Sequence, residues 1–216
     1  MKIKSASFLK SVADKENLVN SDLCEFAFVG RSNSGKSSLI NALVNQKNLA
    51  KTSGTPGLTK LVNYFLINCT EAEFKGNKFS RNISPENEFL PCFFVDLPGY
   101  GYSKAGKHNH ELWSALIEDY FKFSTSLKCV FVLMDIRHEP SILDEQMILY
   151  LYSKNIPFKV IATKADKLAK SKINQYLSQM AKKLKITTNN IIATSSENKF
   201  NLNAVLNSLD SFFENE

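Results

Sequence analysis

The sequence predicts an α/β fold in which a mostly parallel central sheet carries helices on both faces. Short apolar runs, typical of buried strands, alternate along the chain with stretches whose apolar residues recur at helical spacing. The 216 residues are 44% hydrophobic and 22% charged, which excludes disordered, collagenous and disulfide-scaffold proteins. Glycine is scarce, with 8 residues, and all but Gly76 lie in three short stretches. Three loops are therefore marked out for function.

The expected elements follow one another in a regular order. Strands are predicted at residues 24–29, 61–67, 92–95, 129–134, 158–162 and 191–193. Helices are predicted from the apolar stripes within residues 39–44, 112–121, 173–184 and 202–212. Ligands of such sheets bind at the carboxyl ends of the strands. The loops that follow the strands are therefore the place to look for function.

Two segments interrupt this order. Residues 1–22 form a polar N-terminal extension that is expected to add a strand or a helix at the edge, and residues 23–216 form a single domain. Residues 69–90 separate two strands by a polar stretch. Because long loops of this kind are either functional or disordered, this stretch is either a solvated insertion or an arm that contacts a partner.

Composition also bears on location and partners. The longest apolar run, residues 129–134, is far shorter than the roughly 20 residues that cross a bilayer, so we expect a cytoplasmic protein without membrane attachment. The four cysteines stand far apart, which indicates reduced, buried thiols. The net charge of +6 is concentrated in residues 154–185, which hold nine lysines and one aspartate. This basic region either attracts phosphate backbones or is a solvated helix face.

Residues 30–37 (GRSNSGKS) match the pattern GxxxxGK[ST] between a predicted strand and a predicted helix, which is the context that a P-loop requires. Backbone N–H groups of such a loop, and of the helix that follows it, bind phosphate. Lys36 is expected to place its ammonium against the outer phosphates and Ser37 to ligate Mg²⁺. The sequence thus predicts a site for nucleotide phosphates.

The other two glycine-rich loops complete this predicted site. Residues 52–59 (TSGTPGLT) follow the first helix, and either Thr55 or Thr59 supplies a second Mg²⁺ ligand. Residues 96–99 (DLPG) follow a strand as DxxG, so that Asp96 is expected to reach the Mg²⁺ shell through a water and the Gly99 N–H to bond the terminal phosphate. Loss of that phosphate would free the loop, as in other nucleotide switches.

A base-reading motif follows a later strand, at residues 163–166 (TKAD). Asp166 can accept hydrogen bonds from the N1–H and the 2-amino group of guanine, and adenine offers neither. The aliphatic stem of Lys164 can lie on the base, and Thr163 can support the loop. The turn at residues 194–196 is placed to offer a backbone N–H to guanine O6.

The four motifs, in this order and spacing, resemble a Ras-like P-loop GTPase. The segments GRSNSGKSSLIN, TSGTPGLTK, DLPGYGYSK and TKAD resemble in particular the EngB family, also called YihA or YsxC, of bacterial GTP-binding proteins, over nearly the whole chain. The resemblance implies a monomeric, Mg²⁺-dependent GTPase that assists late assembly of the large (50S) ribosomal subunit, with a link to septation and cell division. The alternative is a regulatory GTP-binding module at the division site whose hydrolysis is incidental.

The resemblance also assigns roles to individual residues. The residues expected to contact GTP or GDP are Gly30, Arg31, Ser32, Asn33, Ser34, Gly35, Lys36, Ser37, Ser38, Gly57, Leu58, Thr59, Asp96, Leu97, Pro98, Gly99, Thr163, Lys164, Ala165, Asp166, Thr194, Ser195 and Ser196. The expected Mg²⁺ ligands are Ser37, Thr59 and, through water, Asp96, with Thr59 preferred to Thr55 because it matches the last residue of the family's PGxT. Lys36, Thr59, Gly99 and Asn33 are expected to serve catalysis.

Two positions bear on the rate of hydrolysis. Tyr100 stands where Ras-type enzymes have a glutamine, so no amide orients the attacking water from there and intrinsic hydrolysis is expected to be slow. Asn33 occupies a position that helps to bind K⁺ in related potassium-activated GTPases, and it is either such a ligand or a loop-capping asparagine. Arg137 and His138, after a predicted strand end, are candidates for the rim of the site.

Overall fold

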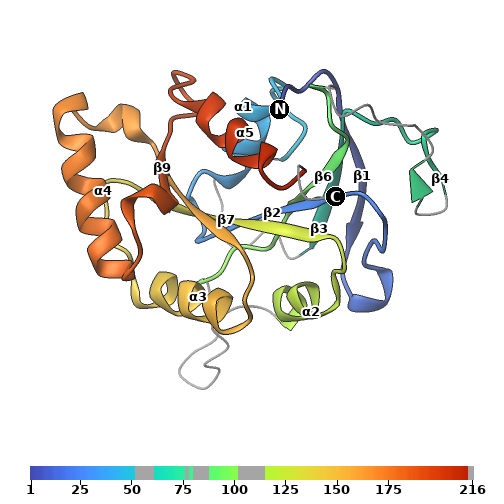
Figure 1. Cartoon of the computed structure of the whole chain (residues 1–216), viewed down its shortest axis with the longest axis horizontal. Coiled ribbons are helices and arrows are strands. Elements are labelled where there is room, and N and C mark those ends of the chain that lie inside the picture. Colours follow the sequence, from blue (N-terminus) through green and yellow to red (C-terminus); the bar gives the residue numbers. More distant parts are fainter. Residues whose placement is uncertain (52–60, 76–77, 80–87, 102–114, 214–216) are drawn as a thin grey trace.

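A computed structural model describes residues 1–51, 61–75, 78–79, 88–101 and 115–213 of the chain. A seven-stranded sheet with the order β1-β3-β6-β2-β7-β8-β9 runs through the molecule, and β4 and β5 form a separate two-stranded sheet (Figure 1). The strands are β1 (Ala6–Val12), β2 (Glu25–Gly30), β3 (Val62–Ile67), β4 (Phe74–Lys75), β5 (Lys78–Phe79), β6 (Cys92–Asp96), β7 (Leu127–Asp135), β8 (Phe158–Thr163) and β9 (Ile191–Ala193).

The direction of the strands confirms the predicted mostly parallel sheet. β2 pairs in parallel with β6 and β7, β7 with β8, and β8 with β9, whereas β3 runs antiparallel to both β1 and β6. The register places Gly30 opposite Leu133 and Asp135 opposite Thr163. The loops after β2, β6, β7, β8 and β9 therefore emerge at one edge of the sheet, which we call the carboxyl edge.

Within the described residues, five α-helices cover both faces of the sheet as predicted, and the apolar stripes predict four of the five. They are α1 (Lys36–Leu43), α2 (Ala115–Phe123), α3 (Ile142–Ser153), α4 (Lys170–Leu184) and α5 (Leu202–Asp210). α1 and α5 pack into one buried apolar cluster, and α2, α3 and α4 pack into the other, on the opposite face (Figure 1). The alternation of strand residues between the two clusters gives the sheet two apolar faces, which explains why its strands read as continuous apolar runs.

α3 is a helix that the apolar periodicity did not predict. Met147, Ile148 and Leu151 are buried, but Ile142 and Leu149 are exposed, so apolar side chains lie all around the helix and leave no clear stripe. Its start is nevertheless well defined. Ser141 and Asp144 form a reciprocal capping box, in which each side chain accepts a hydrogen bond from the other residue's backbone N–H.

Part of the segment at residues 69–90 packs against the core. The ring of Phe74, in β4, lies edge-on to that of Phe93, with centroids 5.1 Å apart, and the Phe79 N–H donates to the Asp22 carboxylate at 3.2 Å. All four cysteines are buried and unbridged, as expected. Within the described ranges, none of the helices has the length and apolar character needed to traverse a bilayer.

Candidate nucleotide-binding site

The loop between β2 and α1 has the backbone of a phosphate cradle. A Cβ at Gly30 would lie 2.6 Å from Ser34 Oγ and 2.7 Å from Leu133 O, so only glycine fits there. Gly35 has φ +90° and is the N-cap residue of α1, and no side chain caps this helix. The first N–H groups of α1 are therefore available to an anion in the loop. The Ser34 hydroxyl is buried with no hydrogen-bond partner in the described part of the chain, and so can serve a ligand as well.

Lys36, at the start of α1, and Asp96, at the end of β6, are in contact. Both side chains are buried, with residue exposures of 8% and 3%, and Lys36 Nζ donates a hydrogen bond to the Asp96 carboxylate. The contact arises because Asp96 ends β6, the strand beside β2. The lysine of the P-loop and the carboxylate of DxxG, 60 positions apart in sequence, thus share one site.

The oxygen atoms at this point suit a magnesium ion bound with a nucleotide. Ser37 lies in the first turn of α1, and Asp96 supplies a carboxylate. Mg²⁺ prefers oxygen ligands and typically takes one or two from protein, with phosphates and waters completing its shell. No group of three His, Cys, Asp or Glu side chains suited to a metal occurs among the described residues. The candidate ligands Thr55 and Thr59, like Gly57 and Leu58, lie outside the described residues.

The DxxG segment lies against the P-loop. The Leu97 N–H donates to Phe28 O at 3.0 Å, and the Tyr100 N–H donates to Gly30 O at 3.2 Å. Between them, Pro98 is buried and Gly99 is exposed. A Cβ at Gly99 would lie 3.3 Å from Gly30 O. Gly99 is therefore held next to the predicted phosphate site and is exposed to solvent.

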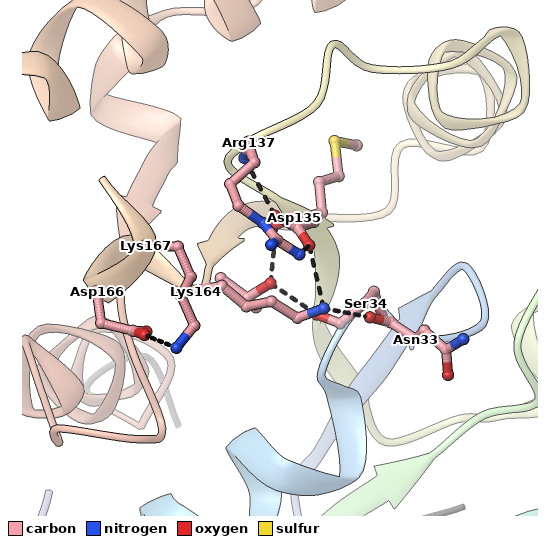
Figure 2. A network of polar contacts seen from close by, with 9 residues as sticks. Asn33, Ser34, Asp135, Arg137, Lys164, Asp166 and Lys167 are labelled. Carbon is pink, nitrogen blue, oxygen red and sulfur yellow. Dashed lines mark hydrogen bonds and ion pairs between the residues drawn. The ribbon is translucent and has the colours of Figure 1, made fainter. Parts of the chain in front are cut away.

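The base-reading loop is bonded directly to the P-loop. Thr163 Oγ1 donates to Ser34 O at 2.6 Å and lies 3.1 Å from Met134 O. Lys164 takes a left-handed conformation, and its Nζ donates to Asn33 O at 2.8 Å (Figure 2). Two side chains of TKAD thus fix the distance between the phosphate end and the base end of the site.

Asp135 is a member of the site that the sequence did not single out. It accepts hydrogen bonds from Arg137 Nε at 2.9 Å and Arg137 Nη2 at 2.7 Å, and it forms an ion pair with Lys164 Nζ at 3.0 Å (Figure 2). Burial raises the pKa of Asp135, but the bonds from Arg137 and Lys164 outweigh burial and hold the pKa below its ordinary value. Asp135 therefore remains charged and orients Lys164. Its position at the end of β7, next to β8, was the available sequence signal.

Asp166 is oriented by the turn after β9. Its carboxylate accepts a hydrogen bond from the Ser195 hydroxyl. It also forms an ion pair with Lys167 at 2.9 Å (Figure 2). The bond from Ser195 and then that from Lys167 lower the pKa of Asp166, so this carboxylate is an acceptor at neutral pH. Thr194 and Ser195 are fully buried, and the Ala165 N–H donates to Thr194 O at 3.1 Å. In the described part of this turn, the Ser195 N–H is already bonded to Phe200 O, which leaves the Ser196 N–H for a ligand.

The remaining predicted residues surround these two ends. Arg31 and Ser32 line a cavity of about 440 Å³ at the P-loop, and Arg137 and His138 form another part of its wall. Ser38 is exposed on α1. Asn33 has φ +66°, a conformation that asparagine tolerates. Its carboxamide points away from Lys164 (Figure 2).

Comparisons with known proteins agree on the kind of domain. A family model described as 50S ribosome-binding GTPase matches residues 25–164. The chain is 44% identical over 184 residues to a probable GTP-binding protein EngB of Flavobacterium johnsoniae, covering 85% of this chain and 78% of that one. It is 41% identical over 215 residues to the protein of the same description from Clostridium kluyveri, covering 99% of this chain and 98% of that one.

Solved structures show the same fold. A crystal structure of a probable GTP-binding protein EngB matches 89% of this chain and 100% of its own, with a TM-score of 0.59 and 19% identity. At this identity the match shows the architecture alone, and it agrees with a Ras-like arrangement of sheet and helices.

Proposed function

The chain belongs to the EngB family of GTP-binding proteins, and from this premise we propose that it is a Mg²⁺-dependent GTPase that acts as a switch in late assembly of the large (50S) ribosomal subunit. In this proposal it works as a monomer in the cytoplasm. The observation that carries the proposal is the pair of hydrogen bonds from Thr163 and Lys164 to the P-loop, because it sets a phosphate site and a purine site at a fixed separation.

Base selection is assigned to Asp166. Held by Ser195 and charged at neutral pH, it accepts hydrogen bonds from the guanine N1–H and 2-amino group. Adenine lacks both donors and presents the lone pair of its N1 to this carboxylate, so it binds poorly. The Lys164 stem, fixed by Asp135 and Asn33, lies on the base.

Phosphate binding is assigned to the P-loop N–H groups and Lys36, with Ser37 and Thr59 as Mg²⁺ ligands and Asp96 acting through water. When bound, the ion offsets the negative charge of the phosphates during transfer. The Gly99 N–H bonds the terminal phosphate. Hydrolysis is slow without a partner, because Tyr100 is buried, with 2% exposure, and orients no water.

We also propose that Asn33 supports K⁺ beside the phosphates. The left-handed backbone of Asn33 turns its carbonyl to Lys164 and its carboxamide away, so the amide oxygen is free for another partner (Figure 2). Hydrolysis is then expected to be faster in KCl than in NaCl, and Asn33→Ala is expected to remove the difference. Equal rates in the two salts would disprove this role.

The proposed ribosomal partner rests on family and charge. The matching family model carries the description 50S ribosome-binding GTPase. On this chain, Arg137, Lys182, Lys183 and Lys185 line a second cavity of about 690 Å³ between α4 and the loop after β7. Exposed lysines of this kind attract RNA phosphates in a salt-sensitive way.

Calorimetric titration of the purified protein with GDP, GTP and ATP, each with and without Mg²⁺, tests the nucleotide assignment. We expect GDP and GTP to bind about 100-fold more tightly than ATP, because Asp166 reads two donors that adenine lacks. We expect Mg²⁺ to strengthen GTP binding in particular. Equal affinity for GTP and ATP would refute the assignment.

Sedimentation with 50S particles tests the partner. The GTP-loaded protein is expected to co-sediment more strongly than the GDP-loaded protein, and the association is expected to weaken as salt rises. Absence from the particles at every salt concentration would count against the ribosomal role. Depletion that blocks septation while ribosome profiles stay normal would favour the module at the division site.

A further inference from the structure

Tyr100, the residue after DxxG, is bonded to both the P-loop and α3. Its N–H donates to Gly30 O, at the start of the P-loop, at 3.2 Å. Its hydroxyl donates to Asp144 Oδ1, in the first turn of α3, at 2.7 Å. Burial and the neighbouring Asp144 carboxylate raise the pKa of Tyr100, so the hydroxyl keeps its proton and remains a donor.

The acceptor of this bond is held rigidly. Asp144 is 3% exposed, and its other oxygen, Oδ2, accepts from both the Ser141 N–H and the Ser141 hydroxyl at 2.7 Å. One carboxylate oxygen therefore closes the capping box of α3, and the other receives Tyr100. The first turn of a helix also favours a negative charge. The Tyr100 hydroxyl is thus bonded to a side chain that is itself fixed at the start of α3.

The backbone beside Tyr100 is equally confined. Gly101 has φ +81°, and a Cβ there would lie 3.0 Å from Leu143 Cδ1 of α3 and 3.6 Å from Arg31 Nε of the P-loop. On the other side of Tyr100, Gly99 lies against Gly30 O. The position of the Gly99 N–H therefore depends on how the next two residues are held between the P-loop and α3.

We propose that Tyr100 is a positioning residue that holds Gly99 at the P-loop through its hydrogen bond to Asp144, so that the ratio of the affinities for GTP and GDP depends on this bond. The inference rests on the proposed function, because only GTP has the terminal phosphate that the Gly99 N–H meets. By thermodynamic linkage, GTP then strengthens the attachment of α3 by the same factor. α3 becomes the element whose first turn responds to the nucleotide.

The chain offers a matched control for the test. Tyr120, in α2, also donates its hydroxyl to a buried carboxylate at 2.7 Å, that of Glu25, at the other edge of the sheet. Tyr100→Phe and Tyr120→Phe remove the same atom from the same kind of bond. Both variants are expected to lower the melting temperature, but only the first touches the DxxG segment.

Affinities for GDP and for the non-hydrolysable analogue GppNHp, measured for wild type and both variants, test the proposal. Tyr100→Phe is expected to weaken GppNHp about 5-fold, as for the loss of one net hydrogen bond, and to leave GDP within about 2-fold. Tyr120→Phe is expected to leave the ratio of the two affinities unchanged. If Tyr100→Phe does not lower the ratio of the GppNHp affinity to the GDP affinity, the proposal is overturned.

Hydrogen exchange on the wild-type protein gives a second measurement that needs no variant. The amides in the first turn of α3 are expected to exchange several-fold more slowly with GppNHp than with GDP. Equal exchange in the two states would overturn the proposal even if Tyr100→Phe did not fold. Wild type that bound neither guanine nucleotide would refute the proposed function itself, whereas normal binding with an unchanged ratio refutes only the role of Tyr100.

Discussion

Two buried tyrosine–carboxylate pairs lie at opposite edges of the sheet, and they differ in how the carboxylate is satisfied. Tyr100 with Asp144 lies at the carboxyl edge, and Tyr120 with Glu25 lies at the amino edge, each at 2.7 Å. Both oxygens of Asp144 have partners. Glu25 Oε2 accepts from Tyr120 and from Ser124, but Glu25 Oε1 has no partner in the described part of the chain.

The two edges also differ in the pKa values of their carboxyl groups. Burial raises the pKa of Glu25 to about 7, although the bonds from Tyr120 and Ser124 act in the opposite direction. At the carboxyl edge, by contrast, bonds from Arg137 and Lys164 keep the pKa of Asp135 low. Near the predicted ligand, Asp135 thus keeps its charge because cationic side chains bond to it. Far from the ligand, ionisation of the buried Glu25 costs stability.

The sharpest test of this division is Asp166→Asn. An amide in place of the carboxylate presents a donor to the guanine N1–H or 2-amino group, so GTP and GDP are expected to bind about 100-fold more weakly or worse. Xanthosine nucleotides, which carry an oxygen where guanine has its amino group, are expected to gain affinity. Calorimetry measures both effects. Glu25→Gln is the control, because it changes a carboxylate at the amino edge and is expected to leave nucleotide affinity unaltered.

Stability against pH tests the amino edge. Since the pKa of Glu25 in the folded protein, about 7, exceeds its ordinary value of 4.5, the native state holds a proton that the unfolded state releases between these values. The contribution of Glu25 to stability therefore falls as pH rises from about 4.5 to about 7 and is level above that. Urea unfolding at pH 5 and pH 8 is expected to show a loss on the order of 2 kcal/mol that Glu25→Gln removes. Parallel pH curves for the two proteins would contradict this expectation.

A smaller effect is expected from Asp135→Ala, which removes the ion pair of Lys164 but keeps its bond to Asn33 O and every residue predicted to contact the nucleotide. GDP is expected to dissociate about 5-fold faster, in line with the loss of a partly exposed charge-assisted bond. Stopped-flow release of a fluorescent GDP measures the rate. Arg137→Ala is the matched control, because Asp135 would keep its ion pair with Lys164, and a smaller change is expected. Equal effects of the two variants would show that Lys164 does not depend on Asp135.

Motifs that are local in sequence could be predicted, and contacts between distant segments could not. The pattern at residues 30–37 carries its glycines and lysine within one loop, so its backbone form was predictable. Asp144 is separated from Tyr100 by 44 positions in the sequence. It belongs to α3, a helix that the sequence did not predict because its apolar residues lie on all sides. Glu25 and Tyr120 are 95 positions apart. Such pairs follow from strand order, which periodicity alone does not give.

Strand order also governs when the site can exist during synthesis of the chain. β2, which leads into the P-loop, has β6 and β7 as its neighbours, and both emerge from the translating ribosome long after it. Asp166 acquires its hydrogen bond from Ser195 only when residue 195 has been made. A nascent chain therefore carries the phosphate-binding sequence well before it can hold a guanine nucleotide, and ligand-assisted folding begins only as translation of this domain nears its end.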